Sequence, residues 1–328
     1  MRKRPYNGDM ATMTAPTLLK RLSRPENPPS SFRITQRDVE IVRAVARFGY
    51  LTSEQIIRYL IVLFGPMSHQ QVLRRLHILF DSHYLNRPEH QHLQLSSFSH
   101  FVYGLGREGA HLLARLGDPV DPRLQWAAKN SASATHLMHT LETAQTMLEF
   151  ERACRSTANL QLLDHAALLP HVPDATRELD HPFRLRVTTQ HDFKKVAINV
   201  VPDRVFSIVL AAEQRHNFCL ELDRGTMSVA ARRITSKSNY ARKILGYYEG
   251  WKQQRHRDQW GFQGFRVLTI TPSETRIANM IDAQRDITGN RVAALFLYST
   301  PERIAAKGAL GDVWMSSEAD GISLLDRK

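Results

Sequence analysis

Cysteine is scarce in this sequence, which has only Cys154 and Cys219 among 328 residues. Both lie in apolar stretches, so we expect small buried side chains rather than a disulfide framework or a zinc ligand set. No run of about 18 apolar residues is present, which argues against a membrane-spanning helix. The opening residues, MRKRPYNGDM, also lack the apolar segment of a secretory signal. We therefore expect a cytoplasmic protein without a membrane partner.

Acidic residues are outnumbered, because 44 Lys and Arg face 32 Asp and Glu, which gives a formal net charge of +12. Residues 1–124 hold 17 of these basic residues against 10 of the acidic ones, so the excess is densest at the front. A basic excess of this size indicates a polyanionic partner, most often nucleic acid. The length and the apolar fraction of 42% predict a globular protein of two domains.

Composition and periodicity divide the chain into five segments. Residues 1–31 are basic, rich in proline and aperiodic, which predicts a disordered arm. Residues 32–118 form the predicted front domain. Residues 119–134 are rich in Pro, Asp, Ser and Ala, which predicts a linker. Residues 135–300 alternate helical and strand patterns, and 301–328 form a C-terminal tail. The predicted class is α/β (α+β), with a mixed sheet in the rear domain.

The front domain begins with three predicted helices, capped by Thr35, Thr52 and Ser68. Two short strands around a polar loop follow, between Tyr84 and Leu105. Three helices and then a hairpin is the order of a winged helix-turn-helix, whose third helix enters the major groove of DNA. The alternative is a small helical domain that binds protein.

The third helix turns polar side chains outward, opposite its apolar stripe. Arg and Gln are residue types that read guanine and adenine edges in the major groove. With one arginine from the hairpin, the predicted DNA-binding residues are Gln70, Gln71, Arg74, Arg75, His77 and Arg87.

Three carboxylates lie in two apolar runs of the rear domain. Glu221 and Asp223 are two residues apart in the strand NFCLELDRG, so their side chains share a face. Asp203 follows Pro202 within AINVVPDRVFSIVL. Burying such acids requires a cation or hydrogen-bond donors, and a hard cation such as Mg²⁺ takes carboxylate oxygens.

Ion pairing is the alternative for these strand-end acids. Their partners would then be Arg204, Arg224 and Arg232. For an arbitrary strand hairpin this second interpretation is the commoner one.

The predicted element order αβββαβ, with Pro202-Asp203 on the second strand and Glu221-Leu222-Asp223 on the third, resembles the PD-(D/E)XK nuclease fold. The resemblance implies strand acids that bind Mg²⁺, which activates water for phosphodiester cleavage. Asp203, Glu221 and Asp223 are its implied catalytic residues.

A lysine and a helix carboxylate complete this implied site. The nuclease fold places a lysine two residues after the second acid, but that position is Asp223 here. Some members carry the lysine on the following helix, where Lys237 is the candidate, with Arg233 as a second cation. Glu142 or Glu149 on the first helix would supply a further metal contact.

From about Ile34 to Thr300 the chain resembles the replication-relaxation family. The similar segments are ITQRDVEIVRAVARFGYLTSEQI, QVLRRLHILFDSHYL, FVYGLGREGAHLL, VPDRVFSIVL, FCLELDRGTMSV and KSNYARKILGYY. Such proteins are associated with plasmids and integrative elements, and with DNA replication or relaxation there. The resemblance implies a protein that binds double-stranded DNA, with a homodimer and the element's replication or conjugation proteins as further partners.

Two other functions fit the same sequence. One is an active Mg²⁺-dependent endonuclease or nickase. The other is a winged-helix transcriptional regulator whose rear domain dimerises or senses a ligand.

Overall fold

A computed structural model describes Arg24 and Gln91 together with residues 32–88, 101–118, 133–191, 194–210, 214–229, 239–289 and 291–325. The arm predicted for 1–31, apart from Arg24, and nearly all of the linker predicted for 119–134 lie outside the described residues. The chain divides into two compact units, Met1–Leu148 and Glu149–Lys328, and each is described by itself.

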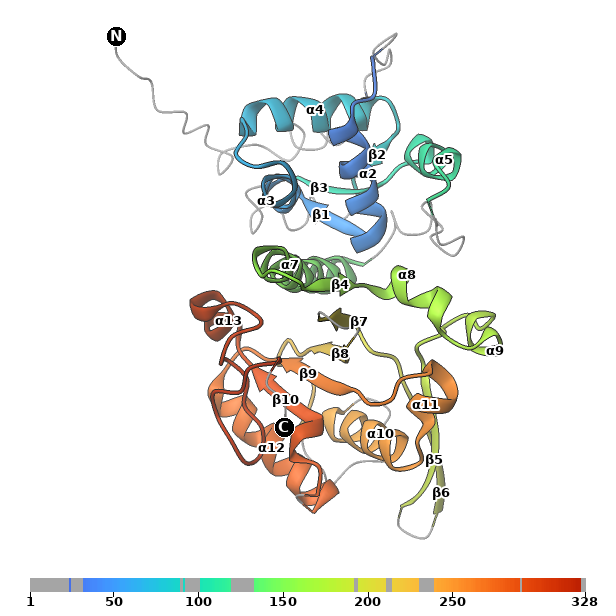
Figure 1. The fold of residues 1–328 in the computed structure, drawn as a ribbon, viewed down its shortest axis with the longest axis vertical. Coiled ribbons are helices and arrows are strands. Elements are labelled where there is room, and N and C mark those ends of the chain that lie inside the picture. Colours follow the sequence, from blue (N-terminus) through green and yellow to red (C-terminus); the bar gives the residue numbers. More distant parts are fainter. Residues whose placement is uncertain are drawn as a thin grey trace. The chain divides into compact units, whose positions relative to one another are not determined.

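The first unit contains the three helices that their capping residues predict (Figure 1). Thr35 forms a capping box with Asp38, and Thr52 forms a second one with Gln55. The side chain of Ser68 caps the third helix. These helices are α2 (Gln36–Phe48), α3 (Ser53–Phe64) and α4 (His69–Asp81).

Three short strands form the sheet of the first unit. They are β1 (Tyr50–Thr52), β2 (Leu85–Asn86) and β3 (Val102–Leu105). β3 lies between the other two and is antiparallel to both. The sequence predicts the β2–β3 hairpin but not β1, because three residues are too few to show an alternating pattern. α5 (Arg107–Arg115) follows β3.

The predicted first helix of the rear domain, which carries Glu142 and Glu149, is present as α7 (Ala134–Ser156). Its first half belongs to the first unit, where Leu137 and Leu141 share a buried cluster with Tyr50. The boundary between the two units therefore falls within this helix.

A mixed sheet forms the centre of the second unit. Its described strands, in spatial order, are β4 (Gln161–Leu163), β7 (Arg204–Val209), β8 (Arg215–Leu222), β9 (Arg266–Ile270) and β10 (Phe296–Ser299). β8, β9 and β10 are parallel, whereas β7 is antiparallel to both of its neighbours. The sequence predicts a strand at each of these places, although β8 begins two residues before the predicted segment NFCLELDRG. The segment after β4 instead turns into the short helix α8 (His165–Leu168).

Side chains along a strand point alternately to the two faces of the sheet, and helices pack on both faces. Phe206 of β7 stacks on Phe218 of β8, and Phe150 of α7 packs against Phe206. The neighbouring Val205 and Cys219 face a core that includes side chains from two later helices. Those helices are α10 (Tyr240–Lys252) and α12 (Glu274–Thr288).

A separate two-stranded ribbon differs from the prediction. β5 (Leu185–His191) and β6 (Lys194–Val200) pair with each other, although the sequence predicted one continuous strand through β6 and β7. That strand breaks at Pro202, because proline lacks the N–H that a central strand needs. Short helices that the sequence did not predict also include α9 (Asp174–Arg177), α11 (Arg255–Trp260) and α13 (Pro301–Lys307). No helix in the described part of the chain is long and apolar enough to cross a membrane.

Candidate functional site

The ends of β7 and β8 bring two acids together. Arg204, the first residue of β7, pairs with Leu220, so Asp203 and Glu221 lie at the same end of the two strands, where the charge of Asp203 acts on Glu221. The Asp203 N–H donates to the Leu220 carbonyl at 3.0 Å, and its carboxylate accepts the Leu222 N–H at 2.7 Å. The two acids therefore meet as the sequence predicted, and Asp203 also fixes the strand end.

Glu221 is buried, with 1% of its surface exposed, and receives two donors from α10. One carboxylate oxygen accepts from the Lys243 ammonium, and the other from the Tyr247 hydroxyl. Lys243 and Tyr247 are four residues apart and so lie on one face of the helix.

The lysine that faces the acids is thus Lys243, whereas the sequence analysis named Lys237. Both Lys237 and Arg233 lie outside the described residues. The i, i+4 spacing of Lys243 and Tyr247 was the available signal, because it presents a cation and a hydroxyl to the same strand.

Burial and charge shift the protonation of this pair. Burial raises the pKa of Glu221 to about 7, and the charge of Asp203 acts in the same direction, against Lys243 and Tyr247. Burial lowers the pKa of Lys243, but the charges of Glu221 and Asp203 outweigh that effect and raise it overall. Lys243 is consequently a permanent cation beside a carboxyl group that titrates near neutral pH.

Asp223 has a different partner from the one predicted. Arg276 of α12 contacts both carboxylate oxygens, one of them at 2.8 Å, and the Thr271 hydroxyl donates to Asp223 at 2.7 Å. Arg276 also donates to the Met227 carbonyl, so the cluster ties the loop after β8 to α12. We therefore assign Asp223 to an ion pair, with an arginine 53 residues away rather than a nearby one.

The remaining acids fit Mg²⁺ with a reduced ligand set. Glu142 lies on the part of α7 that belongs to the first unit and is described there. No three His, Cys, Asp or Glu side chains within the described ranges are grouped as a metal site. Mg²⁺, however, is usually held by one or two carboxylates, several waters and substrate phosphate oxygens. Asp203 and Glu221 would supply two such carboxylates, and their binding of Mg²⁺ stays a prediction.

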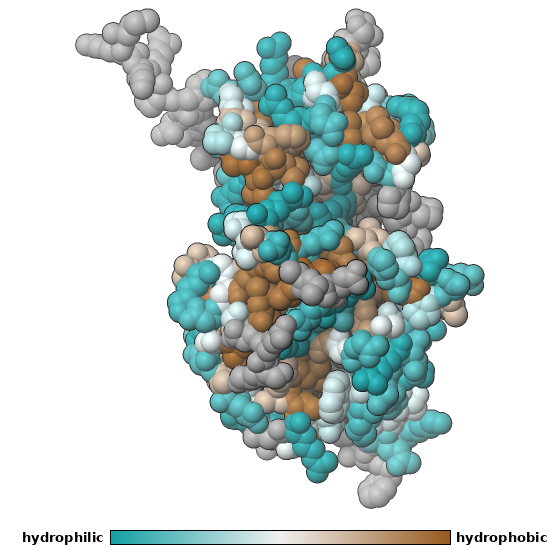
Figure 2. Space-filling model, viewed as in Figure 1, coloured by the Kyte–Doolittle hydropathy of each residue, from teal (hydrophilic) through white to brown (hydrophobic). Residues whose placement is uncertain are grey.

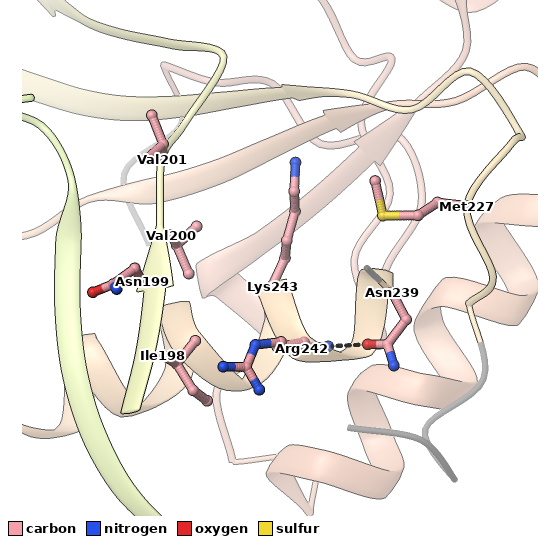
Figure 3. Close-up of a pocket in the computed structure, with 8 residues that line it drawn as sticks. All are labelled: Ile198, Asn199, Val200, Val201, Met227, Asn239, Arg242 and Lys243. Atoms are coloured by element: carbon pink, nitrogen blue, oxygen red, sulfur yellow. Dashed lines mark hydrogen bonds between the residues drawn. The ribbon is translucent and has the colours of Figure 1, made fainter. Parts of the chain in front are cut away.

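A pocket of about 150 Å³ is lined in part by Lys243, the partner of Glu221 (Figure 3). Its lining residues are Ile198, Asn199, Val200, Val201, Met227, Asn239, Arg242 and Lys243. Figure 3 shows the long side chains of Arg242 and Lys243 extending in different directions. Arg242 reaches β6 and donates to the Ala197 carbonyl at 2.7 Å. The pocket therefore combines apolar walls with two cations.

On the first unit, α4 presents a polar surface. Gln70, Gln71, Arg74 and His77 are exposed, while its apolar side chains face the core. Arg74 has no ion-pair partner among the residues that the structure describes. Four of the six predicted DNA-binding residues thus lie on one accessible helix.

The other two, Arg75 and Arg87, stabilise the fold. Arg75 forms two hydrogen bonds of 2.7 Å with the buried carboxylate of Asp38. Arg87 is 5% exposed, lies over the ring of Phe80 and donates to the Tyr103 hydroxyl at 3.0 Å. Both guanidinium groups thus have partners within the first unit, and their role as DNA contacts stays a prediction.

Comparison with known proteins shows the family to which the chain belongs. The family model described as replication-relaxation matches residues 42–264, a segment that includes α4, the acid pair and Lys243. No curated protein and no solved structure matches the chain. Because the matched segment covers more than half of the sequence, the chain belongs to the replication-relaxation family.

Proposed function

We propose that this protein binds double-stranded DNA of a plasmid or integrative element and acts there in replication, relaxation or transfer. The observation that carries the proposal is the exposed face of α4, where Gln70 and Arg74 stand one helical turn apart. Family membership supports a role in replication or relaxation of such an element. The net charge of +12 supports a polyanionic partner.

The element order of the first unit supports α4 as the recognition helix. α2, β1, α3, α4, β2 and β3 follow one another as in a winged helix-turn-helix, with β1 completing the sheet of the hairpin. In such units the N-terminal residues of the recognition helix contact base edges in the major groove. Gln70, Gln71 and Arg74 occupy that part of α4, and their amide and guanidinium groups match adenine and guanine edges.

Selection of bound sequences from a library of random duplexes tests this proposal. The full chain should enrich one preferred sequence. If the recovered duplexes are as random as the input, the assignment of α4 fails. A reporter fused to the element's own promoters then shows whether the bound site serves transcription, as the regulator alternative requires.

The acid pair favours a second candidate function, Mg²⁺-dependent cleavage of DNA. α7, β4, β7, β8, α10 and β9 follow one another in the αβββαβ order of the nuclease resemblance when the elements inserted among them, which include α8, the β5–β6 ribbon and α11, are set aside. Asp203 and Glu221 would hold Mg²⁺, and the metal would supply a water of lowered pKa as nucleophile. Lys243 carries a positive charge beside this site and would stabilise negative charge that develops on a phosphate. Incubation with supercoiled plasmid, with and without Mg²⁺, separates a nicking enzyme from a protein that only binds.

A further inference from the structure

The outer face of the β5–β6 ribbon is polar and positively charged. Three cross-strand pairs share this face, and all six side chains are exposed. They are Arg186 with Asn199, Thr188 with Ala197, and Gln190 with Lys195. Two are cations, three can form hydrogen bonds, and no carboxylate lies among them. Around β5, β6 and α11 the surface is mostly hydrophilic in Figure 2.

The inner face of the ribbon is fixed against α10, which matters because an isolated two-stranded ribbon is only marginally stable. A Cβ atom at Gly246 would lie 2.3 Å from a methyl carbon of Val200, and one at Gly250 would lie 2.3 Å from a methyl carbon of Leu185. The helix backbone therefore touches the ribbon directly. This packing holds the six outward side chains in a fixed array.

The backbone edges of the ribbon are occupied by helix side chains. Gln253 donates to the Thr188 carbonyl at 3.0 Å, and Arg242 donates to the Ala197 carbonyl at 2.7 Å. An added strand would need such edge groups to be available. The face of the ribbon, rather than an edge, is consequently the surface that a partner can reach.

We propose that this face binds the sugar-phosphate backbone of duplex DNA, as a second contact surface besides α4. The inference rests on the proposed DNA-binding function and names a further part of the chain that carries it. Arg, Lys, Thr, Asn and Gln are side chains that contact phosphate oxygens. None of the six side chains is aromatic, whereas surfaces that bind single strands use aromatic rings to stack bases.

The position of the ribbon connects it to the acid pair. Asn199 also lines the pocket that Lys243 borders, so the outer face begins beside that site. Seven-residue strands extend for about 23 Å, and base pairs follow one another every 3.4 Å or so, which allows contacts with several successive phosphates. Duplex DNA bound along the ribbon would thus be led towards Glu221 and Lys243.

The salt dependence of binding by the full chain tests this inference. The double variant Arg186→Ala/Lys195→Ala should bind a short random-sequence duplex more weakly. Its slope of log affinity against log salt should flatten by about 2, because each lost phosphate contact removes about 0.9. Base preference in a duplex selection should not change, since phosphate contacts do not read sequence.

Two control variants accompany the test. Arg152→Ala/Lys307→Ala removes two exposed, ion-paired charges from α7 and α13, and should leave the slope unchanged. Arg186→Lys/Lys195→Arg keeps both charges and should bind like the wild type. Thermal melts verify that all variants are folded.

If the ribbon variant keeps the wild-type slope while Arg74→Ala changes the base preference, this inference is overturned and the proposed function stands. Failure of the wild type to bind duplex DNA would overturn the proposed function as well. Tighter binding of single-stranded DNA or RNA than of duplex would refute the assignment to duplex DNA.

Discussion

The ammonium group of Lys243 on α10 donates directly to the buried carboxylate of Glu221 on β8, across 22 residues of sequence. The charge of Asp203 acts on both Glu221 and Lys243, so two acids lie near one lysine. With both acids ionised, the three side chains together carry one net negative charge. The ion pair therefore joins α10 to the sheet.

Loss of the lysine should destabilise the protein. Lys243→Met leaves the Glu221 charge buried without its main cation, and we expect the free energy of unfolding to fall by roughly 3 kcal/mol at pH 8. The double variant Glu221→Gln/Lys243→Met should be more stable than Lys243→Met, because the uncompensated charge is gone. Urea unfolding of the wild type, both single variants and the double variant measures the coupling. Additive effects would show that the pair contributes nothing.

The raised pKa of Glu221 predicts a pH dependence of stability. This pKa rises from its ordinary value of 4.5 to about 7 on folding. As pH rises, the unfolded chain therefore loses the Glu221 proton at a lower pH than the folded protein does. The contribution of this group to the free energy of unfolding is fully present below pH 4.5 and is lost between pH 4.5 and pH 7.

Across that range the wild type should lose about 3 kcal/mol of stability relative to Glu221→Gln, since one pKa unit corresponds to about 1.4 kcal/mol. The raised pKa of Lys243 does not interfere, because that group titrates only at high pH. Unfolding curves at several pH values give the difference. Parallel profiles for the wild type and Glu221→Gln would contradict the assigned pKa.

Asp203→Asn, Glu221→Gln and Lys243→Met should each abolish Mg²⁺-dependent nicking of supercoiled plasmid while DNA binding persists. The physical reason is the loss of a metal ligand in the first two and of phosphate stabilisation in the third. Asp223→Asn is the matched control, and it should retain nicking but lose stability because Arg276 loses its charged partner.

Lys237→Ala is the companion variant in the plasmid assay. Loss of nicking in that variant, with Lys243→Met still active, would move the catalytic lysine to the position first predicted. A wild type that leaves the plasmid intact in Mg²⁺ would exclude the nuclease candidate.

Arg87→Ala should act through stability instead of DNA contact. Its guanidinium is enclosed by Phe80, Phe101 and Tyr103, and desolvated cation–π contacts contribute about 2 kcal/mol. We expect a lower melting temperature with unchanged base preference in the folded fraction. A change of preference without loss of stability would restore Arg87 to the DNA-binding set.

Local signals explain which parts of the fold were predictable. The caps at Thr35, Thr52 and Ser68 act within one helical turn, so the sequence displays them directly. The meeting of Asp203 and Glu221 followed from strand alternation and a short connection.

Contacts between distant segments explain most of the remainder. Asp38 is 37 residues from Arg75, and Asp223 is 53 residues from Arg276, so no local sequence pattern predicts either ion pair. β6 was joined to the next strand because an apolar run continues through Pro202, and its partner β5 was not predicted.

Base preference in a random-duplex selection tests the central claim, DNA recognition by α4, most directly. Arg74→Ala and Gln70→Ala should each weaken binding to the preferred site by about 1–3 kcal/mol and relax the choice of base at one position. Arg115→Ala, which removes an exposed arginine from α5, should keep the wild-type preference. Identical preferences in the wild type, Arg74→Ala and Gln70→Ala would contradict the assignment of α4 as the recognition helix.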